Sequence, residues 1–387
     1  MKKHKAGEKV SNICEKMEYS RTWFYKWKKR FDSGKSNWFK EKSKAPKNPD
    51  KISDDLENLI IKIRLELMDK EFAHYGPKSI QLEIRRLEIK PPSISTIKRV
   101  MNEDDLVKKN TKYKKKGTPY PDALTTAIGP NSIHQVDFWG QKNITGDGRF
   151  YCLNIMDVYT RRVITYPARR KRTQEAVKGI TKAWDHLGLP DYMQFDNALQ
   201  FRGSNRYPRS FGKIIRLCLV NGIQPIFIPV SEPWRNGYIE KFNDTLNKKF
   251  FRAIKFDNYP HMCNKLKSFT TYHNNKYRYS PLGDHTPEEI YERDRLNSSK
   301  LKYKIPNNPE IEDGEIHVIR LIRSNLKLNI FSETFDMPKD LEYEYVVATI
   351  CTDSHMIRVY DNQLNSLFTL PYKIPNKCNS VNDVLDL

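Results

Sequence analysis

Three acidic residues fall at positions where local folding does not require an acid: Asp137, Asp196 and Glu240. Asp137 interrupts an apolar run, Asp196 follows a short apolar run, and Glu240 lies in a helical segment that opens with a proline. A carboxylate inside an apolar strand is expensive to bury without a partner. Each acid also has an ordinary interpretation. Asp137 could be a strand residue that faces solvent, Asp196 a turn cap, and Glu240 half of a surface ion pair.

Taken together, the three acids predict a site for divalent metal ions. Carboxylates that converge from a strand, a strand end and a helix supply the oxygen ligands that Mg²⁺ prefers, with positions left for water and phosphate. Two such ions, about 3.5 to 4 Å apart, stabilise the attacking and leaving oxygens of an in-line phosphoryl displacement. We therefore expect Asp137, Asp196 and Glu240 to be both the metal ligands and the catalytic residues.

The segment that carries Glu240 predicts a helix that presents this acid rigidly. Its apolar residues recur at helical spacing: Ile239, Phe242, Leu246 and Phe250. Asn236 and Asn243 share another face with Glu240 at i, i+4 and i+7. We expect Asn236, and Asn197 directly after the second acid, to support the site.

The surrounding residues predict an α/β domain with a mixed sheet, because three strands are followed by alternating helices and strands. The expected strands are 134–139, 150–158, 163–167, 192–195 and 223–229, and the expected helices are 173–187, 214–220 and 234–251. The chemistry is expected in this domain, over residues 130–300.

Two helical units precede this domain, and each predicts a helix-turn-helix. In residues 1–50, Ser20 can cap a helix on which an apolar stripe lies opposite three basic residues, Arg21, Lys28 and Lys29. In residues 51–106, Ser95 can cap a third helix that presents Lys98 and Arg99 to DNA. The alternative for the first unit is a basic helical hairpin that reads no groove.

A basic linker and a strand-rich C-terminal segment complete the chain. The linker, 107–129, holds a lysine run without an acid, in which Lys114, Lys115 and Lys116 are candidates to lie along phosphates. Five strand-like runs between 310 and 375 have the spacing of a small antiparallel β-barrel.

Charge and composition favour a polyanionic partner. The 387 residues include 68 Lys plus Arg and 47 Asp plus Glu, which gives a net charge of +21. Cations that neutralise phosphates release counterions and so drive association with nucleic acid. There is no apolar stretch of membrane-spanning length, so we expect no membrane partner. The six cysteines show no metal-binding or disulfide spacing.

The motifs around the three acids resemble a known family. Asp196 stands in Asp-Asn-Ala-x-Gln-Phe and Glu240 in Pro-Trp-x-Asn-Gly-x-x-Glu, and with Asp137 in a strand they are similar to the DDE catalytic domain of insertion-sequence transposases in the retroviral-integrase superfamily. The resemblance covers nearly the whole chain. It implies an RNase-H-like fold, Mg²⁺ or Mn²⁺ with two ions per active site, and strand transfer at element ends. It also implies double-stranded DNA as partner, a homodimer or higher oligomer, and a prokaryotic cytoplasmic, nucleoid-associated protein.

One spacing departs from the family pattern. Many members have 35 residues between the second aspartate and the glutamate, whereas 43 separate Asp196 from Glu240. A count of 35 lands on Glu232, which precedes a proline outside the Asn-Gly-x-x-Glu motif. We prefer Glu240 and interpret the polar segment 203–210 as an insertion, while Glu232 stays open as the third acid. The zinc module of retroviral integrases has no counterpart here.

Further basic and aromatic residues border the predicted site. A basic stretch, Arg169, Arg170, Lys171 and Arg172, could track the DNA backbone. Trp139 and Trp234 could stack on an unpaired base, although core packing is the expected role of both. The main rival function is a non-catalytic DNA-binding regulator derived from a transposase. A second rival is an RNA-directed nuclease of the same fold.

Overall fold

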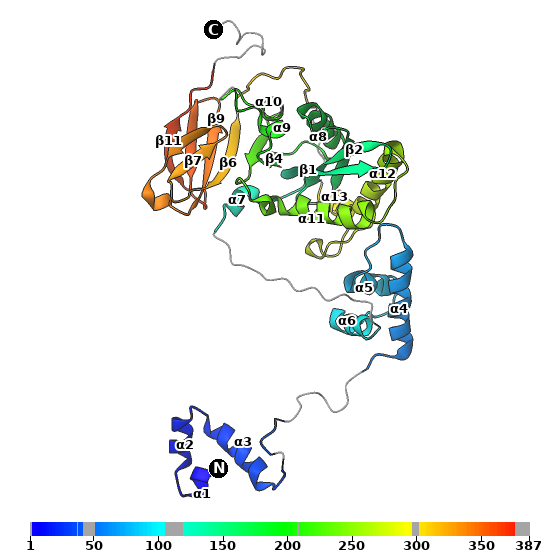
Figure 1. Ribbon diagram of the computed structural model, residues 1–387, viewed down its shortest axis with the longest axis vertical. Coiled ribbons are helices and arrows are strands. Elements are labelled where there is room, and N and C mark those ends of the chain that lie inside the picture. The colour runs from blue at the N-terminus through cyan, green and yellow to red at the C-terminus, as the bar shows by residue number, and fades with distance from the viewer. Residues whose placement is uncertain are drawn as a thin grey trace. The chain divides into compact units, whose positions relative to one another are not determined.

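The computed structural model describes residues 2–36, 38–41, 51–104, 119–206, 209–295 and 302–375 (Figure 1). Two compact units are distinguished, Met1–Leu59 and Ile60–Leu387. The predicted phosphate contacts Lys114, Lys115 and Lys116 lie outside the described residues, as does most of the predicted basic linker.

The first unit contains three helices, α1 (Lys2–Lys5), α2 (Val10–Lys16) and α3 (Arg21–Asp32). Ser20 caps α3 as predicted, because its Oγ accepts a hydrogen bond of 3.1 Å from the backbone N of Trp23. Phe24 packs with Ile13 and Cys14 of α2 in a small core. Arg21 and Lys29 are exposed, and Lys28 pairs with Asp32 at 2.8 Å.

The next helices are α4 (Asp54–Asp69), α5 (Pro77–Arg86) and α6 (Ile94–Glu103). The predicted cap at Ser95 is wrong: Ser93 caps α6, and its Oγ accepts a hydrogen bond of 3.1 Å from Thr96 N. Ser93 has an extended backbone and directly precedes the first helical residue, so its side chain can accept from the first turn. Ser95 already lies inside the helix. Lys98 and Arg99 are exposed on α6, and Arg99 pairs with Glu103 at 2.9 Å.

The central domain contains the predicted mixed sheet. Its strands are β1 (Ile133–Ile144), β2 (Gly148–Asp157), β3 (Val163–Ala168), β4 (Tyr192–Phe195) and β5 (Gln224–Phe227). β1, β2 and β3 are antiparallel neighbours, and β4 pairs in parallel with both β1 and β5. Three strands joined by short turns, followed by strands that are reached through helices, produce this mixture.

Helices cover both faces of this sheet (Figure 1). One face packs on α8 (Thr173–Leu187), α9 (Leu199–Arg202) and α10 (Lys213–Val220). The other packs on α11 (Gly237–Leu246), the π-helical turn η2 (Asn247–Phe251) and α12 (Tyr259–Lys276). Shorter elements are α7 (Asp122–Thr125), η1 (Pro233–Asn236), η3 (Ser280–Leu282) and α13 (Pro287–Asp294). Because side chains alternate along a strand, β1 and β2 each contribute residues to the apolar core on both faces of the sheet.

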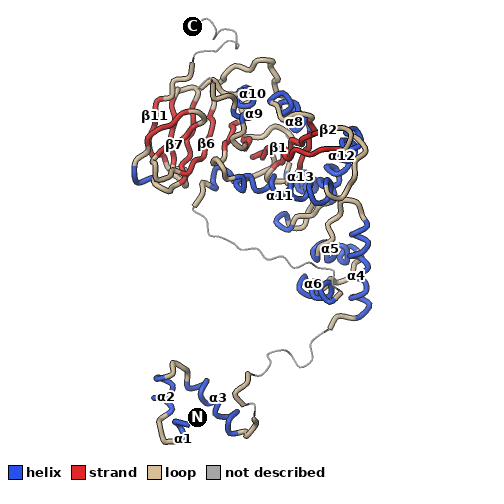
Figure 2. The backbone as a smooth tube through the Cα atoms, viewed as in Figure 1, coloured by secondary structure: helices blue, strands red, loops and turns tan. Residues whose placement is uncertain are grey.

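The C-terminal strands extend the central sheet (Figure 2). β6 (Glu315–Leu321) pairs in parallel with β5, and β9 (Tyr345–Cys351), β10 (Met356–Tyr360) and β11 (Ser366–Pro371) follow in antiparallel order. β7 (Lys327–Ile330) and β8 (Glu333–Asp336) form a separate pair, and η4 (Lys339–Leu341) follows them.

A closed C-terminal β-barrel is not confirmed. Among the described residues, the nine-stranded sheet runs from β3 at one edge to β11 at the other, so neither sheet closes on itself. The interior residues of β6 and all residues of β9 are buried, which is the pattern of central strands covered on both faces. No helix in the described part of the chain has the length and apolarity needed to cross a bilayer.

Candidate active site

Strand pairing sets the first two acids beside each other. β1 and β4 are parallel, with Gln135 opposite Gln194. The same register, continued by two residues, sets Asp137 opposite Asp196, directly after the end of β4. Neighbouring strands lie about 4.8 Å apart and alternate residues share a face, so both acids and both glutamines lie on one face of the sheet. Asp137 and Asp196 are each half-buried there.

That face is the one covered by α11, and buried amides fix the helix to the sheet. The backbone N of Ile239 donates to Gln135 Oε1 at 3.0 Å. Gln194 Nε2 donates to Asn236 Oδ1 at 3.1 Å, and Asn236 Nδ2 donates to the Val136 carbonyl at 3.2 Å. Asn236 therefore links the start of α11 to both strands that carry an acid.

Asn243, two turns along α11, holds the first acid directly. Its Nδ2 donates to Asp137 Oδ2 at 2.6 Å, and its Oδ1 accepts from Asn154 Nδ2 of β2, also at 2.6 Å. Asn154 is fully buried. The helical spacing predicts Asn243 beside Glu240 but assigns it no role, and no sequence motif predicts Asn154. The available signal was a lone amide within the apolar run of β2.

The electrostatics couple all three acids. Burial, and next the charge of Asp196, raise the pKa of Asp137 to about 6, and Glu240 contributes in the same direction. Lys171 and the hydrogen bond from Asn243 act against this rise. Desolvation also raises the pKa of the half-buried Glu240. Negative charge is thus concentrated within β1 and just after the carboxyl end of β4, with Lys171 as the cation that acts on Asp137.

The donor chemistry of this cluster suits a hard divalent cation, since it consists of carboxylate oxygens whose mutual repulsion a cation would offset. Their side chains do not form a preassembled cage: within the described ranges, no group of three His, Cys, Asp or Glu residues is disposed to hold a metal ion. What the fold supplies is the placement of two acids on adjacent strands and a third on the helix fixed across them.

Comparison with known families adds to this geometry. Residues 128–233 match a family model described as integrase core domain, and residues 221–287 match a second model with the same description. The chain carries an integrase core domain. The predicted membership of the retroviral-integrase superfamily is thereby confirmed. Residues 1–58 match a winged helix-turn helix model, in agreement with the predicted N-terminal unit. No curated protein matches the chain.

Solved integrase structures share low similarity with the chain. The HTLV-2 integrase catalytic core domain in complex with magnesium is 16% identical, covering 43% of this chain and 99% of that one, with a TM-score of 0.33. The catalytic core domain of BIV integrase is 18% identical over 42% of this chain and 95% of that one, with a TM-score of 0.32. A simian T-cell lymphotropic virus intasome, solved in complex with PP2A regulatory subunit B56 gamma, is 14% identical over 78% of this chain and 96% of that one, with a TM-score of 0.38.

Glu232, the other candidate for the third acid, belongs to a different network of the integrase core. It is buried, pairs with Arg235 at 3.0 Å and accepts hydrogen bonds of 2.7 and 2.8 Å from the hydroxyl of Tyr345 in β9. Its charge is not among those that shift the pKa of Asp137, whereas that of Glu240 is. The geometry therefore favours Glu240.

The predicted insertion, 203–210, begins at a close backbone contact with a glycine two residues past its end. Gly203 has a φ of 98°, and a Cβ atom on Gly203 or Gly212 would lie 2.6 to 2.7 Å from the backbone of the other glycine. Gly212 N also donates to the Arg202 carbonyl at 3.1 Å. These glycines enclose eight residues, which is the number by which 43 exceeds 35.

Asn197 secures the turn that carries Asp196. Its Nδ2 donates to the Ile228 carbonyl at 2.6 Å, and its Oδ1 accepts from the buried Arg320 at 2.7 Å. Asp196 Oδ1 accepts from Ala198 N at 3.0 Å, so this carboxylate also stabilises its own turn. The contacts are consistent with the supporting role predicted for Asn197.

The basic stretch that precedes α8 is divided between two roles. Arg169 pairs with Asp147 and stacks on Tyr259, away from the acids. Lys171 is the member whose charge acts on Asp137. Arg170 and Arg172 are exposed. DNA contacts remain a prediction for all four, and Lys171 is the member best placed to reach a phosphate at the acids.

Proposed function

We propose that this protein is a DNA transposase, a polynucleotidyl transferase that hydrolyses a phosphodiester bond at each element end and joins the resulting 3′-OH to target DNA. The observation that carries the proposal is the placement of Asp137 opposite Asp196 in the β1 and β4 register, with Glu240 on a helix fixed across both strands. Integrase core domains in general process DNA, and the strand-transfer step is the part that we add.

In this proposal the chain's residues have separate tasks. Asp137, Asp196 and Glu240 bind two Mg²⁺ or Mn²⁺ ions, which when bound activate the nucleophile and stabilise the leaving oxygen. Asn243 orients Asp137 through its 2.6 Å hydrogen bond. The amide network around Asn236 prevents α11 from moving relative to the strands, so the spacing of the acids is set before DNA binds.

The two proposed reactions balance without a covalent enzyme intermediate. In the first, water attacks the phosphorus and the P–O3′ bond breaks, which leaves a 3′-OH and a 5′-phosphate. In the second, that 3′-OH attacks a target phosphodiester, and one phosphodiester bond forms as another breaks. Both are in-line displacements at phosphorus, so one set of carboxylates serves both.

Element-end recognition is assigned to the helical units. Arg21, Lys28 and Lys29 on α3, and Lys98 and Arg99 on α6, present cations from short helices of the kind that enter the major groove. Two element ends in one complex require at least a homodimer. Binding of double-stranded DNA should weaken with salt by about 0.9 in log affinity per log salt for each phosphate neutralised.

The test is nicking of supercoiled plasmid by the full chain in Mg²⁺, Mn²⁺ or EDTA. Asp137→Asn, Asp196→Asn and Glu240→Gln should each abolish metal-dependent nicking while leaving DNA binding in EDTA intact. Glu232→Gln is the matched control and should still nick. Unchanged nicking in the first three variants would rule out this site. DNA binding without nicking by the unaltered protein would instead establish a regulator, and cleavage of RNA in a hybrid without DNA strand transfer would establish a nuclease.

A further inference from the structure

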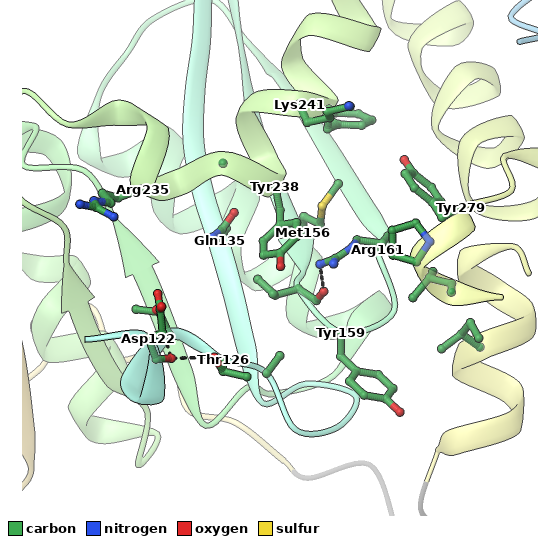
Figure 3. A pocket seen from close by; sticks show the side chains of 18 of the residues that line it. Asp122, Thr126, Gln135, Met156, Tyr159, Arg161, Arg235, Tyr238, Lys241 and Tyr279 are labelled. Carbon is green, nitrogen blue, oxygen red and sulfur yellow. Dashed lines mark hydrogen bonds between the residues drawn. The ribbon is translucent and has the colours of Figure 1, made fainter. Parts of the chain in front are cut away.

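A cavity lies beside α11, and none of the three acids lines it (Figure 3). It has a volume of about 1090 Å³ and is bounded by α11, the ends of β1 and β2, the segment around α7 and residues 279–293. Tyr238 and Lys241 of α11 line it. At 3.6 residues per turn, Glu240 points about 160° away from Tyr238, so the helix separates the cavity from the three acids.

Cations predominate in the wall of this cavity. Four are Arg161, Arg235, Lys241 and Arg293, against a single lining acid, Asp122. Arg235 and Arg293 are paired with acids beside them, Arg235 with Glu232 at 3.0 Å. Within the described part of the chain, the ammonium group of Lys241 has no hydrogen-bond or ion-pair partner, and Arg161 pairs with no acid. These two charges are available to an anionic ligand.

Exposed aromatic rings share this cavity with the two available cations, and one of them lies against Arg161. The guanidinium of Arg161 lies 3.6 Å from the ring centroid of Tyr238, and it donates to the Val158 carbonyl. Tyr238 is 46% exposed, and Trp234, at the start of η1, is 60% exposed. Core packing, the role expected for both tryptophans, holds for Trp139, which stacks on Phe251 at 4.5 Å, but not for Trp234.

An exposed indole and phenol, in one cavity with two cations that pair with no acid, match the chemistry of a nucleotide. Bases stack on aromatic faces, while Lys and Arg contact the phosphates that join them. The volume slightly exceeds the usual range for small-ligand pockets, about 300 to 1,000 Å³, so more than one nucleotide fits. Apolar ligands without charge would leave the lysine ammonium desolvated and unpaired.

We propose that this cavity binds unpaired nucleotides of the DNA substrate, with a base stacked on Trp234 or Tyr238 and a phosphate held by Arg161 and Lys241. The proposal rests on the proposed function, because it assumes that DNA is the substrate of the acids on the opposite flank. The helix is about 10 Å thick, so a short unpaired stretch can extend from the cut to the cavity. The site would therefore retain one separated strand while the other reacts.

The test measures binding of fluorescein-labelled octathymidylate to the full chain by anisotropy, in EDTA. Trp234→Ala should weaken binding about tenfold or more, as expected for loss of one stacked base. Lys241→Gln should weaken it several-fold and lower the salt slope by about 0.7, which corresponds to one single-strand phosphate contact. Both side chains protrude into solvent, so neither change should unfold the protein.

Matched controls are Tyr343→Ala, an exposed aromatic residue far along the chain, and Lys248→Gln, an exposed lysine just beyond α11. Both should bind octathymidylate like the unaltered protein. Equal affinity of Trp234→Ala, Lys241→Gln and the controls would overturn the proposal. So would displacement of the DNA by oligoglutamate at comparable concentration, since the cavity would then bind any acidic chain.

The outcome is separable from that of the nicking test. Octathymidylate binding needs neither metal nor acids, so Asp137→Asn should bind it normally. If substitution of the acids leaves nicking unchanged while DNA binding still depends on Trp234, the proposed function is contradicted and the binding site stands. If nicking depends on the acids while binding does not depend on Trp234, the proposed function stands and the binding site is contradicted.

Discussion

The two flanks of α11 differ in charge and in how their charges are balanced. On one flank lie Glu240 and the two aspartates, where burial, and next the charge of Asp196, raise the pKa of Asp137 to about 6. On the other, Arg161 and Lys241 line a cavity, and Arg161 lies over the ring of Tyr238. Incompletely compensated charge of opposite sign thus lies on the two sides of one helix of ten residues.

The difference shows how one helix can serve two kinds of ligand. The anionic flank is suited to cations, and the cationic flank is suited to phosphates. Buried amides carry no net charge, and here they supply hydrogen bonds between the helix and the sheet, through Gln135, Gln194, Asn236 and Asn243. A charged anchor at any of these positions would compensate one flank and weaken its affinity for ligand.

The largest effect is expected from Glu240→Gln. Loss of one carboxylate from the anionic flank should lower Mg²⁺-dependent nicking about a thousandfold, the upper range for removal of one electrostatic group from an active site. Octathymidylate binding in EDTA should not change. Plasmid nicking and anisotropy on the same preparation check both expectations, and a parallel loss of binding would mean that the flanks are not independent.

The pH dependence of stability should have opposite signs on the two flanks. His273, buried beneath the cavity wall, hydrogen-bonds Tyr279 at 2.7 Å, and burial lowers its pKa to about 4. The unfolded state, with a pKa of 6.5, binds more protons between these values, so the free energy of unfolding falls by about 3 kcal/mol as pH drops from 6.5 to 4. For Asp137 the folded state binds more protons, so stability falls as pH rises from 3.8 through about 6.

Urea denaturation in EDTA across pH 4 to 7.5 measures both contributions. His273→Gln should flatten the acid limb, and Asp137→Asn should raise stability near neutral pH relative to the unaltered chain. A destabilising effect of Asp137→Asn at pH 7 would show that the acids do not repel one another in the folded protein.

A smaller effect is expected from Asn243→Leu. The change removes the donor to Asp137 and leaves the amide of buried Asn154 without its partner. Nicking should fall about ten- to a hundredfold, as for other residues that orient metal ligands. Asn275→Ala, on the exposed face of α12, is the control. Activity retained at low Mg²⁺ would argue against an orienting role.

The smallest change in nicking is expected from Glu232→Gln. Its pairing with Arg235 secures η1 from the cavity side, so the variant should lose about 1 to 3 kcal/mol of stability. Nicking should stay within about threefold of the unaltered rate at a temperature where both proteins are folded. A loss as large as that of Glu240→Gln would move the third acid to Glu232.

Sequence patterns predicted the elements well where periodicity is local. The strand that carries Asp137, the helix that carries Glu240 and the cap at Ser20 all follow from residues within a few positions. The pairing of β5 with β6 does not, because it joins residues about 90 positions apart. For this reason the C-terminal strands were predicted to close on themselves, whereas they extend the central sheet.

Only part of the candidate site could be predicted from the sequence. The three acids stand out because a charge there conflicts with the apolar context, and Asn197 and Asn236 follow from their motifs. Asn154 and the exposure of Trp234 depend on which face of the sheet α11 covers, and no local pattern encodes that choice. The cavity is likewise assembled from five segments between residues 120 and 293.

Because Gly203 and Gly212 are in contact, the segment between them starts and ends at the same place. The number of residues between Asp196 and Glu240 can therefore change with the length of this segment, while the distance in space between the two acids stays the same. This segment is accordingly the place where the domain can gain or lose residues, or carry a fused peptide, without displacing its acids. A motif defined by the helix that follows Pro233 selects Glu240, whereas one defined by a count of 35 residues selects Glu232.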